Sequence, residues 1–142
     1  MKIEISIFIN RPSADVFAYI SNFENNPKWQ GGMVDAWFTT EPPMRVGSTY
    51  SQVAVFLGRR VESTFEVTEY QAGRLIKARS VVSTFPITFT RIVDAENGGS
   101  RVTAIVEGDA SGIFKLAEPL LAGKVNKSIH KDYENLKKIL EN

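Results

Sequence analysis

The sequence predicts an α+β fold, in which a curved seven-stranded antiparallel sheet packs around one long C-terminal helix. Three observations predict it. An apolar strand is followed by two short helical segments, residues 33–110 then alternate apolar and polar side chains with a period of two, and residues 113–141 repeat near the 3.6-residue period of a helix. Short connections favour a meander of consecutive antiparallel strands. The sheet and the long helix each have one apolar face, and packing these faces together buries both.

The N-terminal residues predict the first strand and both short helical segments. Isoleucine occupies every second position from 3 to 9, which is typical of a strand with one apolar face. Pro12 ends this strand because proline has no N–H to donate, and Pro12 followed by Ser13 is a helix-start signal. We therefore expect a helix over 13–21 and a shorter helical turn over 23–29, which Pro27 limits.

The middle of the chain predicts six strands separated by turn residues. The run Asn97-Gly98-Gly99 is the strongest hairpin signal, because Asn and Gly tolerate a positive φ angle. The expected strands cover 33–41, 48–57, 60–71, 74–83, 86–95 and 100–110. The final helix, expected over 113–141, has an apolar stripe made by Phe114, Leu121, Val125, Ile129, Tyr133, Leu136 and Leu140.

Composition bounds the size of the protein and excludes several kinds of site. The 142 residues suit one domain over 1–142, with 43% apolar and 23% charged residues. There is no cysteine and a single histidine, His130, so we expect no thiolate or multi-histidine metal site and no cofactor. A net charge of +1 gives no reason to expect nucleic acid as a partner. The chain has no long apolar run and no secretory pattern at its start, which predicts a cytoplasmic protein.

One long helix cannot fill a wide, curved sheet, so this arrangement predicts an internal apolar cavity and hence a ligand site. The more apolar face of each strand predicts which side chains point into it. For strand 60–71 these are Val61, Ser63, Phe65 and Val67. For strands 48–57, 74–83 and 86–95 they are Ser51, Val53, Val55 and Leu57, then Ile76, Ala78, Ser80 and Val82, then Ile87, Phe89 and Arg91.

Arg91 is the most informative of these positions, because an inward-facing arginine is costly unless it is paired. Glu118, within the apolar arc of the final helix, and Asp132, near its edge, are the candidate partners. Two interpretations are open. Arg91 either anchors a carboxylate, phenol or ketone of a ligand, or forms a structural salt bridge or lies in water at the mouth of the cavity.

The candidate ligand-binding residues combine inward positions with aromatic side chains that can stack on a flat ligand. They are Trp37, Tyr50, Val53, Val55, Phe65, Ser80, Phe89, Arg91, Glu118, Leu121 and Val125. The chain has no phosphate-binding loop and no zinc-protease motif, and His130 falls on the charged face of the final helix rather than in a catalytic triad. No catalytic residue is therefore predicted.

Five short stretches occur in an order and at a spacing typical of one family. They are INRPSADVF at 9–17, SNFENNPKW at 21–29, VGSTY at 46–50, VTEY at 67–70 and LKKILE at 136–141. Through them the whole chain resembles the START-like superfamily, also called SRPBCC or helix-grip, and within it the polyketide cyclase/dehydrase-like group. The resemblance implies an internal apolar pocket, which in this superfamily serves lipid and sterol carriers, hormone binders, quinone-binding proteins and aromatase/cyclases.

Three functions remain as alternatives. The first is binding of a small apolar or amphipathic molecule, such as a lipid, a quinone or an aromatic metabolite. The second is a cyclase or dehydratase acting on a polyketide-like substrate, with Arg91, Glu118 or Tyr50 as its polar groups, and a cavity carboxyl with a raised pKa would favour it. The third is a non-enzymatic protein-interaction module. The expected partner is a small hydrophobic molecule, without integral membrane contact, and the oligomeric state is open, a homodimer included.

Overall fold

The computed structural model describes residues 2–56, 58–83, 86–108 and 113–142, and it describes side chains for all of these except 113–122. The α+β architecture expected from the sequence is confirmed. In chain order the elements are β1 (Lys2–Ile9), α1 (Ser13–Ser21), a short 3₁₀ helix η1 (Phe23–Asn25), α2 (Asn26–Trp29), β2 (Met33–Phe38), β3 (Thr49–Phe56), β4 (Arg59–Gln71), β5 (Leu75–Val82), β6 (Ile87–Glu96), β7 (Gly99–Gly108) and α3 (Ile113–Glu141).

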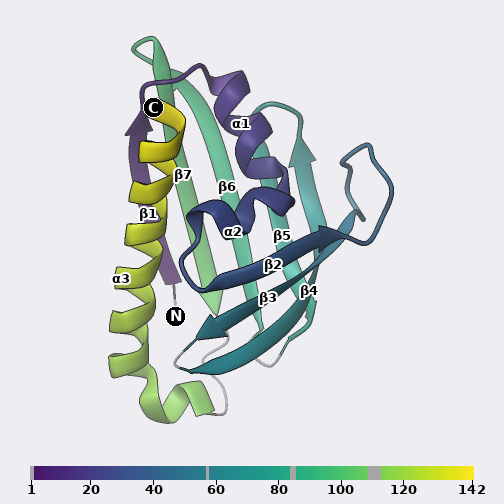
Figure 1. Ribbon diagram of the computed structural model, residues 1–142, viewed down its shortest axis with the longest axis vertical. Coiled ribbons are helices and arrows are strands. Elements are labelled where there is room, and N and C mark those ends of the chain that lie inside the picture. Colours follow the sequence, from purple (N-terminus) through teal and green to yellow (C-terminus); the bar gives the residue numbers. More distant parts are fainter. Residues whose placement is uncertain (1, 57, 84–85, 109–112) are drawn as a thin grey trace.

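The seven strands form one antiparallel sheet in the order β1-β7-β6-β5-β4-β3-β2. The sheet curls, and α3 runs along it beside β1 while α1 and α2 lie over its upper part (Figure 1). The contacts of α2 are with β2 on one side and with α3 on the other. The helices therefore cover the concave face between the two edge strands, as the two apolar faces require.

Turn residues set the element boundaries close to the expected ones. Asn97 and Gly98 both have positive φ angles and make the β6–β7 hairpin, as the sequence predicts. The main difference is β2, which ends at Phe38 rather than at 41. The chain there leaves the sheet for a loop that contains Pro42 and Pro43, residues with no N–H to donate to a strand ladder.

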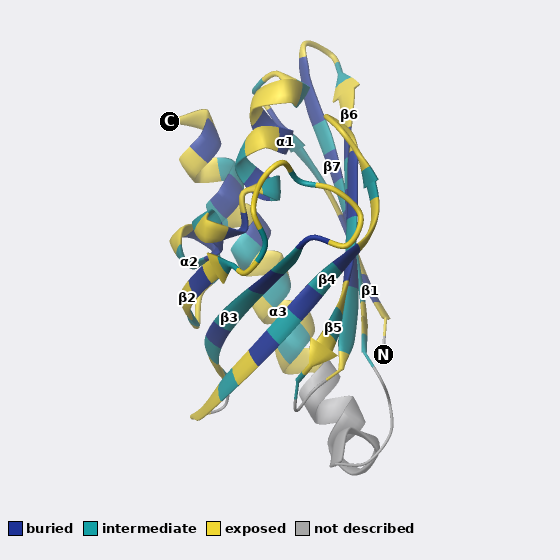
Figure 2. Ribbon diagram, turned by 90° about the vertical axis from the view of Figure 1, so that its right-hand side faces the viewer, coloured by how far each residue is buried: buried dark blue, intermediate teal, exposed yellow. Residues whose placement is uncertain are grey.

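Stacked aromatic rings form the centre of the core. The ring of Tyr50 lies between those of Phe23 and Phe65, with centroids 4.0 and 5.2 Å away. Phe89 contacts both Phe23 and Phe65, at 5.9 and 5.6 Å. Along β4, the buried residues Ser63, Phe65 and Val67 alternate with more exposed ones, which shows one face of this strand turned to the core (Figure 2). The aromatic residues therefore join the short helices to the sheet.

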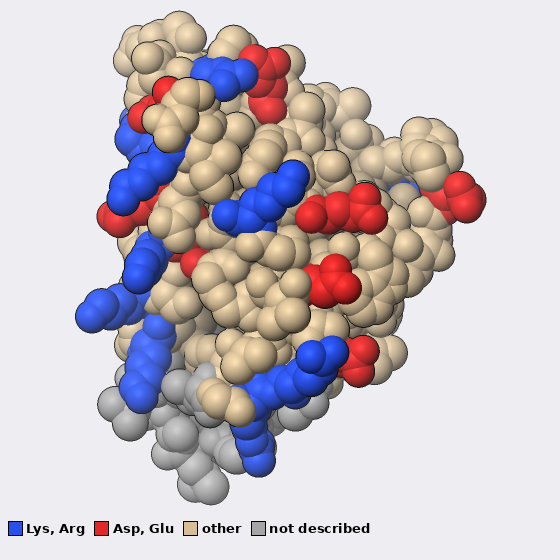
Figure 3. Space-filling model, in the orientation of Figure 1, with Lys and Arg blue, Asp and Glu red and all other residues tan. Residues whose placement is uncertain are grey.

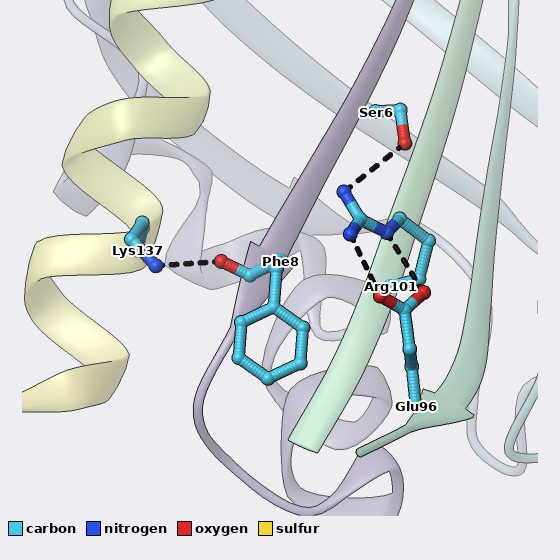
Figure 4. Close-up of polar contacts among 5 residues, drawn as sticks. All are labelled: Ser6, Phe8, Glu96, Arg101 and Lys137. Atoms are coloured by element: carbon cyan, nitrogen blue, oxygen red, sulfur yellow. Dashed lines mark hydrogen bonds and ion pairs between the residues drawn. The ribbon is translucent and has the colours of Figure 1, made fainter.

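Polar contacts fix the C-terminal end of α3 to β1 and the β1–α1 connection. Lys137 Nζ donates to the Phe8 carbonyl oxygen at 2.6 Å, and Arg11 Nη1 donates to the Leu140 carbonyl oxygen at 2.8 Å. Figure 4 shows the Lys137 contact beside the Arg101–Glu96 ion pair, whose atoms lie 2.7 Å apart.

Basic side chains of α3 project outward on the face seen in Figure 3. Among the residues described, no helix is long and apolar enough to cross a membrane.

Leu136 is the clearest test of how strongly α3 holds the fold together. Its side chain is fully buried (0% exposed), whereas Ile139, one turn on, is 38% exposed. Leu136→Ala should lower the free energy of unfolding by about 3 kcal/mol, because it leaves a cavity in the core. Ile139→Ala should cost about 1 kcal/mol or less. Urea unfolding of both variants measures this, and equal losses would contradict the packing described.

Candidate ligand-binding cavity

A cavity of ≈ 250 Å³ lies between α2, α3 and the strands β3, β4 and β6. Its wall is mostly apolar and aromatic, with Tyr50, Phe65 and Phe89 from the sheet and Trp29 and Tyr133 from the helices. An apolar cavity of about 150 Å³ is enough to hold one benzene molecule, so this one suits a ligand of roughly ten non-hydrogen atoms or slightly more.

The structure brings five of the predicted residues to the cavity and leaves four elsewhere. Tyr50, Phe65, Phe89, Arg91 and Val125 line it. The four that do not line it are Trp37, Val53, Val55 and Ser80. Glu118 and Leu121 lie outside the described side chains.

The inward face predicted for β3 was wrong. The even-numbered residues Tyr50, Gln52, Ala54 and Phe56 line the cavity, whereas Val55 is 44% exposed on the opposite face. Val53 is buried but shares the parity of Val55, so it too lies on the outer side of the strand. The inward set is held there by two contacts that strand alternation does not reveal. The Tyr50 ring stacks between Phe23 and Phe65, and the Gln52 amide Oε1 accepts a hydrogen bond from Asn26 Nδ2 at 3.4 Å.

Trp37 and Ser80 do not line the cavity, and contacts within the sheet explain the position of each. On β2 the buried residue is Ala36, so its neighbour Trp37 points to the outer face, after a register shift between Met33 and Asp35. The Ser80 hydroxyl accepts a hydrogen bond from the Ile87 backbone N–H at 2.9 Å. It therefore fixes the approach of β6 to β5 instead of facing a ligand.

Arg91 points into the molecule from β6 and is only 6% exposed. Its Nε donates to the Tyr133 hydroxyl at 3.1 Å, and its Nη1 donates to the Ile20 carbonyl oxygen at 3.3 Å. The Ile20 carbonyl is in the last turn of α1, where helix carbonyls lack partners and carry partial negative charge. The guanidinium also lies 4.6 Å from the Phe89 ring centroid and 5.0 Å from that of Trp29, within cation–π range.

The salt bridge between Arg91 and Asp132, one of the alternatives that the sequence leaves open, is not formed. Among the described residues, no carboxylate oxygen lies within 4.0 Å of the guanidinium, and Glu118 cannot be compared because it is outside the described side chains. The Asp132 carboxylate instead accepts a hydrogen bond from the Gly31 backbone N–H at 2.9 Å, which ties α3 to the turn after α2. A guanidinium has five N–H bonds, and two of those of Arg91 have acceptors among the described residues, which leaves three without an acceptor there.

Asp132 lines the cavity, and the pKa of its carboxyl group is shifted from the ordinary value. Burial raises its pKa to about 6, although the hydrogen bond from Gly31 and the charges of Arg91 and Lys131 act to lower it. Burial also raises the pKa of the Tyr50 phenol, so that side chain stays protonated. The polar end of the cavity therefore combines a fixed positive charge with a carboxyl that titrates near neutral pH.

Sequence reasoning missed the polar side chains that α2 contributes. Asn26, Trp29 and Gln30 line the cavity, and each has a buried atom with no partner among the described residues. These atoms are Asn26 Oδ1, Trp29 Nε1 and Gln30 Nε2. No signal in the sequence singled these residues out, because the segment from 23 to 29 mixes polar and apolar side chains and a four-residue helix has too few positions for periodicity to show its inward face. In the described part of the chain, no group of three acidic or histidine side chains is placed to hold a metal ion.

Comparison with known proteins gives a family and a fold. A family model described as "Polyketide cyclase / dehydrase and lipid transport" matches residues 1–141. No curated protein matches the sequence.

Three solved structures illustrate the similarity of fold. The protein TTHA0849 from Thermus thermophilus has a TM-score of 0.83 at 16% identity, covering 97% of this chain and 95% of its own. A START superfamily protein from Mycobacterium smegmatis has a TM-score of 0.78 at 12% identity, with 99% and 97% covered. The Zhui aromatase/cyclase from Streptomyces sp. R1128 has a TM-score of 0.78 at 11% identity, with 99% and 93% covered. At these identities the likeness shows the fold alone.

The raised pKa of Asp132 makes a signed prediction for stability. The folded protein keeps a proton on this carboxyl up to a pKa of about 6, against 3.8 as its ordinary value. Folding therefore takes up a proton between these pH values, and the contribution of Asp132 to stability falls as the pH rises through them. Asp132→Asn should remove this fall. We expect wild type to lose on the order of 1 kcal/mol relative to the variant between about pH 4 and pH 7, since the carboxyl is partly solvated.

Urea unfolding of both proteins at several pH values measures the difference. Asparagine retains an oxygen that can accept the Gly31 hydrogen bond, so the comparison isolates the charge. Parallel stability curves for the two proteins would contradict the raised pKa.

Proposed function

Because the chain belongs to the polyketide cyclase/dehydrase and lipid transport family of the START-like superfamily, whose members typically bind hydrophobic ligands, we propose that its cavity binds a small, flat, amphipathic molecule. A carbonyl, carboxylate or phenolate oxygen of that molecule contacts Arg91, and its apolar body lies against the aromatic wall. The size of the cavity favours a molecule of one or two rings over a long-chain lipid.

The observation that carries this proposal is the burial of the Arg91 guanidinium without a carboxylate partner among the described residues. Its charge is buried, no carboxylate pairs with it among the described residues, and only two of its five N–H bonds have acceptors there. A buried charge with unused donors is costly, and a ligand oxygen that accepts from it relieves that cost. Tyr50, Phe65 and Phe89 supply ring faces for the remainder of the ligand.

Naphthoate and methylnaphthalene form a matched pair of probes, because they share the two-ring body and differ in the carboxylate. We expect wild type to bind naphthoate about tenfold or more tightly than methylnaphthalene, which corresponds to a charge-assisted hydrogen bond. Arg91→Leu should lose this preference while still binding methylnaphthalene. Isothermal titration calorimetry measures both affinities.

Arg79→Leu is the control for this experiment. Arg79 lies on the neighbouring strand β5 with its side chain 59% exposed, so the same substitution there should leave naphthoate binding unchanged. Circular dichroism checks that each variant is folded, and Arg91→Lys provides a second variant that keeps the charge while losing the planar donor set. Unchanged naphthoate affinity in folded Arg91→Leu would contradict the proposed anchor.

One observation favours a second candidate function, an enzyme that moves a proton on a carbonyl substrate. Asp132, with its pKa of about 6, lines the same cavity as Arg91. At neutral pH it is mostly ionised and is suited to act as a general base. In this reading the Asp132 carboxylate takes a proton from the carbon next to a carbonyl, and the electron pair moves to the carbonyl oxygen, where Arg91 stabilises the negative charge.

Deuterium exchange into tetralone, a two-ring ketone, tests this second function. In heavy water the wild-type protein should accelerate exchange at the carbon next to the carbonyl by about a hundredfold, which is the lower range for general-base catalysis. Asp132→Asn should show no acceleration, and nuclear magnetic resonance follows the loss of the proton signal. Exchange as fast in Asp132→Asn as in wild type would contradict the role of Asp132, while leaving ligand binding at Arg91 unaffected.

A further inference from the structure

A pair of serine hydroxyl groups lies on the sheet wall of the cavity, apart from Arg91. Ser63, on β4, is only 9% exposed, and its Oγ lies 2.8 Å from the Ser83 Oγ, within hydrogen-bond distance. Both serines line the cavity. The neighbouring inward positions of β4 hold Val61 and Phe65, so an apolar side chain would fill this position as well. The hydroxyl pair is therefore a polar feature that packing alone does not require.

The strand register separates this pair from Arg91 along the sheet. Arg91 pairs with Ile76 on β5, whereas Thr64, the residue after Ser63, pairs with Val82. From Ile76 to Ser83 is seven residues, or roughly 23 Å of extended strand at about 3.3 Å per residue. The curl of the sheet and the length of the arginine side chain shorten the distance between the polar atoms. The two polar groups nevertheless face one cavity from different ends.

Further polar side chains continue from Ser63 toward α2. Gln52 is the cross-strand neighbour of Ser63, and its amide Oε1 accepts a hydrogen bond from Asn26 Nδ2. The Asn26 Oδ1 is buried and has no partner among the described residues. One wall of the cavity thus has a row of uncharged polar groups, while Val106, Val125 and Ile129 line it with aliphatic side chains.

We propose that the Ser63–Ser83 pair binds a second oxygen group of the ligand, a neutral hydroxyl or carbonyl, at the end of the molecule opposite the oxygen that contacts Arg91. This inference rests on the proposed function, since it assumes a ligand held at Arg91. Serine hydroxyls both donate and accept hydrogen bonds, and none of the side chains in this row is charged, so the site takes a neutral group. The ligand class is an elongated aromatic molecule with oxygen at both ends, rather than one with a plain hydrocarbon tail.

Two matched pairs of probes of different length test this inference. The first is naphthoate against hydroxynaphthoate, and the second is cinnamate, a narrower and longer carboxylate, against its hydroxylated form, each with the hydroxyl on the ring carbon farthest from the carboxylate. In at least one pair, wild type should bind the hydroxylated probe about fivefold more tightly, as one additional neutral hydrogen bond provides. Ser63→Ala should reduce this preference to none while binding the unhydroxylated probe as wild type does.

Ser51→Ala is the matched control. Ser51, on β3, also has its Oγ 2.8 Å from a hydroxyl of the neighbouring strand, that of Thr64, but it does not line the cavity. Its variant should keep the full preference for the hydroxylated probe. Equal affinities of both members of each pair for wild type, or a preference that persists in Ser63→Ala, would overturn the inference and leave the Arg91 anchor standing. Failure of all four probes to bind would instead contradict the proposed function, and this inference with it.

Discussion

The buried guanidinium of Arg91 is the constraint around which the cavity is organised. A positive charge inside a protein requires compensation, and here the compensation comes from several different elements. The last turn of α1 supplies the Ile20 carbonyl, α3 supplies the Tyr133 hydroxyl, and Phe89 and the α2 residue Trp29 supply ring faces. These partners are all neutral, so the described side chains surround the charge of Arg91 without cancelling it.

Asp132 lines the same cavity without pairing with Arg91. A carboxylate bound directly to Arg91 would neutralise the charge and leave the cavity without a strong donor. The Asp132 carboxylate instead accepts a hydrogen bond from Gly31 and retains a raised pKa. At one end of the cavity, the Arg91 donor and the titratable Asp132 acceptor therefore come from opposite walls. Aromatic side chains line the cavity between that end and the serine pair of the sheet. This polarity gives an otherwise apolar cavity a preferred orientation for a ligand.

Patterns in the sequence predicted the fold well, because strand alternation, turn residues and the stripe of α3 each depend on local chemistry. The inward orientation of Arg91, Phe89 and Phe65 followed from the same alternation and is confirmed. The orientation of β3 did not follow, since the more apolar set of that strand faces outward and Gln52 faces inward, bonded to Asn26. The contribution of α2 also escaped prediction, because the roles of Asn26 and Trp29 depend on contacts with distant strands and with α3 rather than on local periodicity.

The proposed ligand binding depends most directly on contact between Arg91 and a ligand oxygen inside the cavity. A crystal structure of the protein soaked with naphthoate measures this in one experiment. We expect the carboxylate within hydrogen-bonding distance of the Arg91 guanidinium, with the rings against Phe89 and Tyr50. A structure in which Asp132 has moved to pair with Arg91 and naphthoate is absent from the cavity would contradict it.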